Sequence, residues 1–244
     1  MIEKFDKFLV IGHRGASSLA PENTLKAFNK AIELKADCIE FDVQESKDSQ
    51  LVIAHDEDLL RVTGKEGFIR DLTLSELKKL DFGEGEQIPT LEELFNTTKG
   101  KILLNLEIKT KGLANSIVQL IHEYDMIDEI LISCFIFEEL IKIRKIDSNL
   151  KIAVLGPYKT GWMRNWISRK NLLSFTSKHL FFAINPSYFI VNEKFVKRAH
   201  KNNIKVFPWT VDEVPDITRL LNYYVDGIIT NDISKLQEVL KISN

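Results

Sequence analysis

The sequence contains very little cysteine and no long apolar run. Only two cysteines occur in 244 residues, Cys38 and Cys134, and they lie far apart in apolar surroundings. This scarcity argues against a disulfide-stabilised scaffold and predicts two buried free thiols in a reducing compartment. No stretch approaches the roughly 18 continuous apolar residues that a membrane-spanning helix requires. The hydrophobic fraction of 44% is ordinary, so the chain can form a substantial core.

An excess of charge of either sign is also missing. The chain carries 33 basic and 35 acidic residues, for a formal net charge of -2. This balance gives no reason to expect nucleic acid or a charged membrane surface as a partner. The apolar run near the N-terminus is too short for a secretory signal, and Glu3 and Asp6 interrupt the basic character of the segment before it. We expect a soluble cytoplasmic protein without stable membrane association, as a monomer or a homodimer.

Short apolar runs rich in β-branched residues recur along the chain and predict eight strands. Their continuous apolar character is typical of parallel strands that are buried on both faces. The predicted strands cover residues 8–12, 37–43, 102–109, 129–133, 151–155, 181–184, 204–209 and 227–230.

Helical patterns separate most of these strands, and Asn23 is predicted to cap the first helix. The predicted helices cover residues 23–34, 88–95, 113–124, 136–146, 161–179, 193–203, 214–224 and 232–240. Strand–helix units of this number and length predict an α/β protein of the (β/α)8 TIM-barrel class. A doubly wound open sheet is the alternative. We expect a single domain over residues 1–244, with a small insertion at about 57–88 after the second strand.

Acidic side chains lie at the ends of the second and third predicted strands. Glu40 and Asp42 are two residues apart and share a strand face, and Glu107 shares a face with Asn105 and Lys109. The active site of a barrel lies at the C-terminal ends of its strands, so the three carboxylates should converge. Packed negative charges need a cation between them, and oxygen ligands suit Mg²⁺ or Ca²⁺. Pairing with Lys or Arg is the alternative for any single acid.

Two histidines lie beside this predicted cation site. His13 ends the first predicted strand, and His55 follows the apolar run at 51–54. Two imidazoles flanking a substrate can act as base and acid, because their pKa lies near the working pH. Arg14 and Lys109 provide positive charge for an anion. With a divalent cation, the three carboxylates and these two side chains leave a single formal positive charge, which matches a phosphodiester.

Several motifs occur in an order that resembles a known family. They are HRGAS and PENT within 13–24, E-x-D at 40–42, HD at 55–56, IPTLEE at 88–93, N-x-E-I-K at 105–109, PWTV at 208–211 and DGIIT at 226–230. Together they resemble the glycerophosphodiester phosphodiesterase family, from about residue 8 to the end of the chain.

The resemblance implies a metal-dependent hydrolase of glycerol and lipid metabolism. Such an enzyme would use Mg²⁺ or Ca²⁺ and cleave glycerophosphodiesters to glycerol phosphate and an alcohol. The implied roles are metal ligation by Glu40, Asp42 and Glu107, acid–base catalysis by His13 and His55, phosphate binding by Arg14 and Lys109, and an aromatic pocket wall formed by Trp209.

Three residues differ from those usual in the family, and we expect these differences to affect substrate preference more than activity. Asp212 stands where an amide is more usual, Cys134 where a second serine is common, and Val62 where threonine is common. Three other functions stay open on sequence grounds. They are a lysophospholipase D-like lipid phosphodiesterase, a Schiff-base aldolase or isomerase with Lys109 as nucleophile, and a catalytically silent binding barrel.

Overall fold

A ring of parallel strands forms the centre of the protein. The computed structural model describes residues 4–156 and 162–243, and the side chains of 4–156 and 169–242. The sheet order is β8-β7-β6-β5-β4-β2-β1-β9, and β3 pairs with β2 in antiparallel orientation. The strands are β1 Leu9–His13, β2 Cys38–Glu45, β3 Leu51–Ile53, β4 Leu103–Ile108, β5 Ile130–Cys134, β6 Lys151–Leu155, β7 Ala183–Asn185, β8 Lys205–Val206 and β9 Gly227–Thr230.

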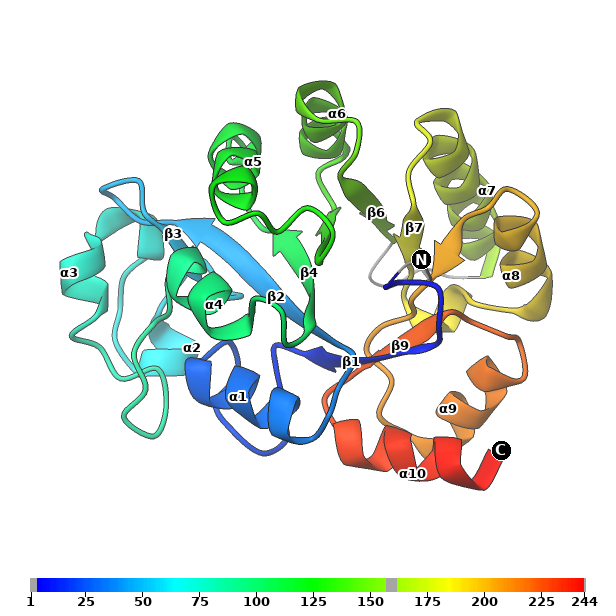
Figure 1. Ribbon diagram of the computed structural model, residues 1–244, viewed down its shortest axis with the longest axis horizontal. Coiled ribbons are helices and arrows are strands. Elements are labelled where there is room, and N and C mark those ends of the chain that lie inside the picture. Colours follow the sequence, from blue (N-terminus) through cyan, green and yellow to red (C-terminus); the bar gives the residue numbers. More distant parts are fainter. Residues whose placement is uncertain (1–3, 157–161, 244) are drawn as a thin grey trace.

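The two strands at the ends of this order meet and close the ring. The backbone nitrogen of Asp226 donates to the carbonyl of Val206 at 3.0 Å, and that of Ile229 donates to Pro208 at 2.9 Å. Helices lie around the outside of the ring (Figure 1). The predicted (β/α)8 barrel is therefore confirmed, and the open doubly wound sheet is wrong.

Each predicted helix appears, with ends shifted by a few residues. The helices of the repeating units are α1 Leu25–Glu33, α4 Leu91–Thr98, α5 Ala114–Glu123, α6 Phe137–Ile146, α7 Trp162–Lys178, α8 Glu193–His200, α9 Val214–Leu221 and α10 Ile233–Ser243. The predicted helix start at residue 161 lies outside the described residues. No described helix combines the length and the apolarity needed to cross a bilayer.

The predicted cap of the first helix is wrong by one residue. Thr24 is the N-cap of α1, and its side chain accepts a hydrogen bond from the nitrogen of Ala27. Asn23 instead adopts a left-handed backbone conformation with φ of 58°. Its side-chain nitrogen donates to Asp42 at 2.9 Å, so this amide supports the acidic strand rather than the helix.

Between β3 and α4 the chain forms an excursion with its own small core. It contains α2 Leu60–Thr63, the 3-10 helix η1 Ile69–Asp71 and α3 Leu74–Leu77. The buried side chains of this core are Val52, Ala54, Leu59, Ile69, Leu77, Phe82 and Ile88. Because β3 runs antiparallel to the end of β2, with Val43 opposite Ile53, it carries the following residues back toward the barrel mouth.

Apolar side chains fill the inside of the barrel below its mouth. This inner cluster consists of Phe5, Leu9, Ile11, Cys38, Leu103, Leu131, Ala153, Ala183, Phe207 and Ile229. A larger apolar layer separates the strands from the surrounding helices. Cys38 and Cys134 are both buried free thiols, as predicted.

Gly227 allows β9 to pass close to β1 and to the inner cluster. A Cβ atom at this position would lie 2.6 Å from the carbonyl oxygen of Leu9 and 3.0 Å from Cδ1 of Phe207. We predict that Gly227→Ala lowers the free energy of unfolding by about 1–3 kcal/mol, the usual cost of overpacking. Urea denaturation would measure this loss.

Gly100→Asn serves as the control. Gly100 has φ of 73° with no atom within 4 Å of an added Cβ, and asparagine tolerates this conformation. If Gly227→Ala cost no more stability than Gly100→Asn, the close approach of β9 would not be a constraint on the fold.

Candidate active site

The inward face of most barrel strands changes from apolar to polar at the mouth. Inward residues recur every second position along a strand. The change occurs from Ile11 to His13, Cys38 to Glu40, Leu103 to Asn105, Leu131 to Ser133, Ala183 to Asn185 and Ile229 to Asn231. The site is therefore a polar layer that lies directly on the apolar filling of the barrel.

Two neighbouring strands bring the three predicted acids together. In the register of β2 with β4, Glu40 lies opposite Asn105 and Asp42 lies opposite Glu107. One oxygen from each of Glu40, Asp42 and Glu107 lies within 4.8 Å of the others, and all three side chains are buried. Such a cluster of hard oxygen atoms is the donor set that Mg²⁺ and Ca²⁺ prefer.

Burial and mutual repulsion disturb the protonation of these acids. Burial, together with the charges of Asp42 and Glu107, raises the pKa of Glu40 well above its ordinary value. Burial and the charge of Asp42 raise the pKa of Glu107 to about 7. Burial alone would also raise the pKa of Asp42, but the positive charges of Lys109 and Arg14 bring it below its ordinary value. The positive charge of Lys109 and Arg14 is therefore too small for all three carboxyl groups to ionise readily.

Lys109 and Arg14 both lie against the acids. The Lys109 Nζ lies 2.7 Å from Glu107 Oε1 and 3.4 Å from Asp42 Oδ1. The Arg14 Nε lies 3.4 Å from Asp42 Oδ2, and its Nη1 donates to Glu22 at 2.9 Å. The two predicted phosphate-binding cations thus partly neutralise the carboxylates.

A strained turn after β1 places Arg14. Its φ is 54°, in the left-handed region, and the next residue, Gly15, has φ of 85°. A Cβ on Gly15 would lie 2.8 Å from atoms of Ala27 in α1. The backbone nitrogen of Arg14 donates to Glu40 Oε2 at 3.0 Å. Non-glycine residues at positive φ often mark functional sites, because other contacts must hold them there.

His13 is held by an amide that is itself held by a carboxylate. The Asn231 Nδ2 donates to Asp212 at 2.6 Å, so the Asn231 Oδ1 faces His13 Nδ1 at 2.7 Å. His13 Nδ1 therefore carries the proton and Nε2 is the acceptor, 3.9 Å from Glu40 Oε2. Burial, followed by the charge of Arg14, lowers the pKa of His13 to about 4.

His55 has a charged partner instead. Its Nδ1 lies 2.6 Å from Asp56 Oδ1, and Asp56 also accepts a hydrogen bond from Arg61 Nε in α2. Arg61 donates to both oxygens of Glu22, at 2.6 and 3.1 Å. Burial lowers the pKa of His55, although Asp42 and Asp56 act in the opposite direction. The excursion thus supports His55, and through Glu22 it also contacts Arg14.

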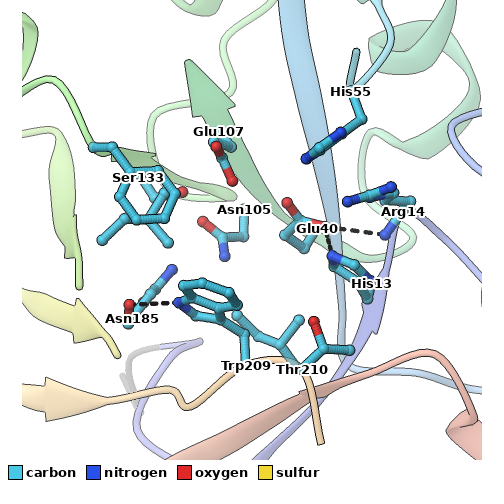
Figure 2. Close-up of a pocket in the computed structure, with 13 residues that line it drawn as sticks. His13, Arg14, Glu40, His55, Asn105, Glu107, Ser133, Asn185, Trp209 and Thr210 are labelled. Atoms are coloured by element: carbon cyan, nitrogen blue, oxygen red, sulfur yellow. Dashed lines mark hydrogen bonds and ion pairs between the residues drawn. The ribbon is translucent and has the colours of Figure 1, made fainter. Parts of the chain in front are cut away.

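Most predicted site residues surround one cavity of about 140 Å³. Asp42 and Lys109 are not part of its wall, but an oxygen of Asp42 lies within 4.8 Å of Glu107, and Lys109 Nζ lies 2.7 Å from Glu107 Oε1. The Trp209 Nε1 donates to the backbone carbonyl of Asn185 at 2.7 Å, which fixes the indole at the wall (Figure 2). The wall consists of His13, Arg14, Glu40, His55, Asn105, Glu107, Ser133, Phe135, Leu155, Asn185, Trp209, Thr210 and Ile229.

Sequence reasoning missed several polar residues of this region. Asn185, Ser133 and Asn231 follow apolar inward residues by two positions, so the period-two pattern could have identified them. Glu22 and Arg61 act through a long-range ion pair, which no local pattern reveals. Asp212 appeared only as a departure from the family pattern, but it anchors the amide that holds His13.

The chain is similar in sequence to known proteins over nearly its whole length. The profile of the Glycerophosphoryl diester phosphodiesterase family matches residues 13–235. A glycerophosphodiester phosphodiesterase of Caldanaerobacter subterraneus subsp. tengcongensis is 40% identical, over 96% of this chain and 98% of that protein.

Two solved structures are similar over nearly the whole chain. The glycerophosphodiester phosphodiesterase of Thermotoga maritima has a TM-score of 0.79 and 32% identity, covering 96% of this chain and 98% of that one. A phosphodiesterase of Oleispira antarctica, in complex with the product sn-glycerol-3-phosphate, has a TM-score of 0.81 and 25% identity, covering 96% of each chain.

The carboxylate cluster makes a prediction about cation binding. Chelator-treated protein should bind Mg²⁺ or Ca²⁺ in isothermal titration calorimetry. Glu40→Gln and Glu107→Gln should each weaken this binding by at least roughly 10–100-fold, the loss that follows when a residue that only hydrogen-bonds to a metal ligand is replaced. Added cation should also raise the melting temperature of the wild type more than that of the variants.

Glu138→Gln removes one charge at an exposed position and is the matched control. Equal cation affinity in all four proteins would show that the acids do not bind the ion.

Proposed function

We propose that this chain, which belongs to the glycerophosphoryl diester phosphodiesterase family, hydrolyses glycerophosphodiesters to sn-glycerol 3-phosphate and an alcohol. The main support for the proposal is that two imidazoles and two buried carboxylates line one cavity, and that a third buried carboxylate, Asp42, lies within 4.8 Å of the other two. The named activity of the Caldanaerobacter relative and the product seen in the Oleispira structure support this choice of reaction.

The proposed cofactor is a divalent cation held by Glu40, Asp42 and Glu107. Their oxygen atoms lie close enough to share one ion, and the raised pKa values of Glu40 and Glu107 reflect a shortage of positive charge there. When bound, Mg²⁺ or Ca²⁺ would polarise the phosphoryl oxygens and stabilise the added negative charge of the transition state.

We assign phosphate binding to Arg14 and Lys109. Both already lie against the carboxylates, at 3.4 Å from Asp42. Once a divalent cation neutralises the acids, these two side chains can turn their remaining N–H groups toward the phosphodiester. A guanidinium and an ammonium are suitable donors for phosphate oxygens.

The two histidines differ in their partners, which suggests different roles. His13 has a neutral amide partner and presents an unprotonated Nε2, so we assign it to accept the proton of the attacking hydroxyl. His55 has a carboxylate partner, Asp56, which stabilises an imidazolium. We therefore assign His55 to protonate the leaving alkoxide. The attacking hydroxyl is that of water or of the substrate glycerol.

The Schiff-base alternative fits the geometry poorly. Lys109 Nζ lies within ion-pair distance of both Glu107 and Asp42. Two carboxylates at these distances favour the charged ammonium, whereas a Schiff-base lysine must lose its proton. A catalytically silent barrel is also disfavoured, because every predicted catalytic group is present at the site.

The acid–base assignment predicts a large loss of activity when either imidazole is removed. His13→Ala and His55→Ala should each lower kcat for glycerophosphocholine by roughly 10²–10⁴-fold, measured as release of glycerol 3-phosphate with saturating Mg²⁺ or Ca²⁺. The fold should survive, because neither side chain belongs to an apolar cluster.

His122→Ala is the matched control, since His122 lies on the outer helix α5. It should retain the wild-type kcat. Turnover near that of the wild type in both catalytic variants would refute the assigned roles.

A further inference from the structure

Two buried amides at the cavity have no evident role in the fold. Asn105 in β4 and Asn185 in β7 are fully buried. Within the described part of the chain, neither their side-chain oxygen nor their side-chain nitrogen has a protein hydrogen-bond partner. An unsatisfied buried polar group destabilises the folded protein, and most buried polar groups in proteins are hydrogen-bonded. A ligand would give these amides the partners that the protein does not supply.

The backbone at these positions does not require an amide side chain. The Asn185 carbonyl accepts hydrogen bonds from Trp209 Nε1 and from the nitrogen of Gly156, and both bonds involve main-chain oxygen. Asn105 pairs through its backbone with β2 and β5. Any residue could make these bonds, so the fold does not explain why the side chains are amides.

Both side chains project into the same part of the cavity. Figure 2 shows Asn105 between Glu107 and the Trp209 indole, and Asn185 beside the end of the indole that donates to its carbonyl. All of these residues line the cavity. The inner apolar cluster closes the barrel below this point, since Leu103 and Ala183 precede the two amides on their strands. The amides therefore form the inner end of the substrate pocket.

The chemistry of this inner end suits a small neutral polyol. A side-chain amide offers N–H donors and an oxygen acceptor without charge, and a hydroxyl group both donates and accepts. Two facing amides can therefore bond two neighbouring hydroxyls. At about 140 Å³, the cavity is small beside the roughly 300–1,000 Å³ of pockets for drug-sized ligands. An acyl chain brings no hydroxyl and needs more room.

We propose that Asn105 and Asn185 bind the two free hydroxyls of the glycerol moiety and so restrict the enzyme to phosphodiesters whose glycerol carries no acyl chain. This assignment rests on the proposed function and sharpens it. It places the leaving alcohol at the open side of the cavity, and it disfavours the lysophospholipase D-like alternative, whose substrates have one of these hydroxyls acylated.

A binding comparison tests the assignment without depending on any variant. Calorimetry on the wild-type enzyme with saturating Mg²⁺ would compare sn-glycerol 3-phosphate with n-propyl phosphate, which lacks both hydroxyls. We expect glycerol 3-phosphate to bind roughly 10–100-fold more tightly, because propyl phosphate displaces water from the amides without replacing its hydrogen bonds. Equal affinities would overturn the assignment.

Variants of the two amides then test whether these side chains bind the glycerol hydroxyls. Asn105→Ala and Asn185→Ala should each reduce the preference for sn-glycerol 3-phosphate over n-propyl phosphate by about tenfold. The affinity for n-propyl phosphate should stay unchanged. Their melting temperatures should equal or exceed that of the wild type, since an unsatisfied amide is removed. Asn202→Ala, at an exposed position, should keep the full preference. A preference retained in both cavity variants would also overturn the assignment.

Turnover separates this proposal from the proposed function. Choline release would be compared for glycerophosphocholine and for a hexanoyl lysophosphatidylcholine that stays monomeric. We expect at least about tenfold higher kcat/KM for the unacylated substrate. Hydrolysis of both substrates at equal kcat/KM would overturn the specificity but keep the phosphodiesterase. Hydrolysis of neither, with the binding preference intact, would refute the proposed function and keep the polyol site.

Discussion

Repulsion among three buried carboxylates is the constraint on which the rest of the site depends. Glu40, Asp42 and Glu107 come from neighbouring strands whose register is fixed by backbone pairing, so they cannot move apart. Lys109 and Arg14 offset part of the charge, but the pKa values of two of the acids still rise. A divalent cation bound by the three acids would supply the missing positive charge, and it would free Lys109 and Arg14 to face a phosphate. The proposed cation site and the proposed phosphate site would therefore both follow from the same shortage of positive charge.

The barrel supports this cluster because its inward-facing residues change from apolar to polar toward the mouth. Inward residues are apolar in the lower part of the ring and polar at the mouth, and the change occurs at almost the same level on most strands. The apolar filling excludes water from below, which strengthens every electrostatic interaction above it. The excursion after β3 adds support from the side, since Arg61 holds both Asp56, the partner of His55, and Glu22, the partner of Arg14. The excursion and the barrel strands thus together hold His55 and Arg14 in place.

Much of this could be predicted from the sequence, because the relevant patterns are local. Apolar runs gave the eight strands, and the two-residue spacing gave the acidic face. What escaped prediction depends on contacts between distant segments. Asn23 has a good residue type for a helix cap, yet tertiary contact with Asp42 and a left-handed backbone place it elsewhere, and Thr24 caps the helix. The unsatisfied state of Asn185 becomes visible only when all of its neighbours are known.

In the proposed site, Glu40, Asp42 and Glu107 share one cation, and this cation holds the phosphate between the imidazoles of His13 and His55. Crystals grown with Mn²⁺ as an anomalous scatterer would test it most directly. We expect a single strong anomalous peak at roughly 2.0–2.6 Å from oxygen atoms of Glu40, Asp42 and Glu107, with the Nε2 atoms of His13 and His55 facing the open side of the ion. A peak elsewhere, or acids that still pair only with Lys109 and Arg14 at saturating Mn²⁺, would contradict it.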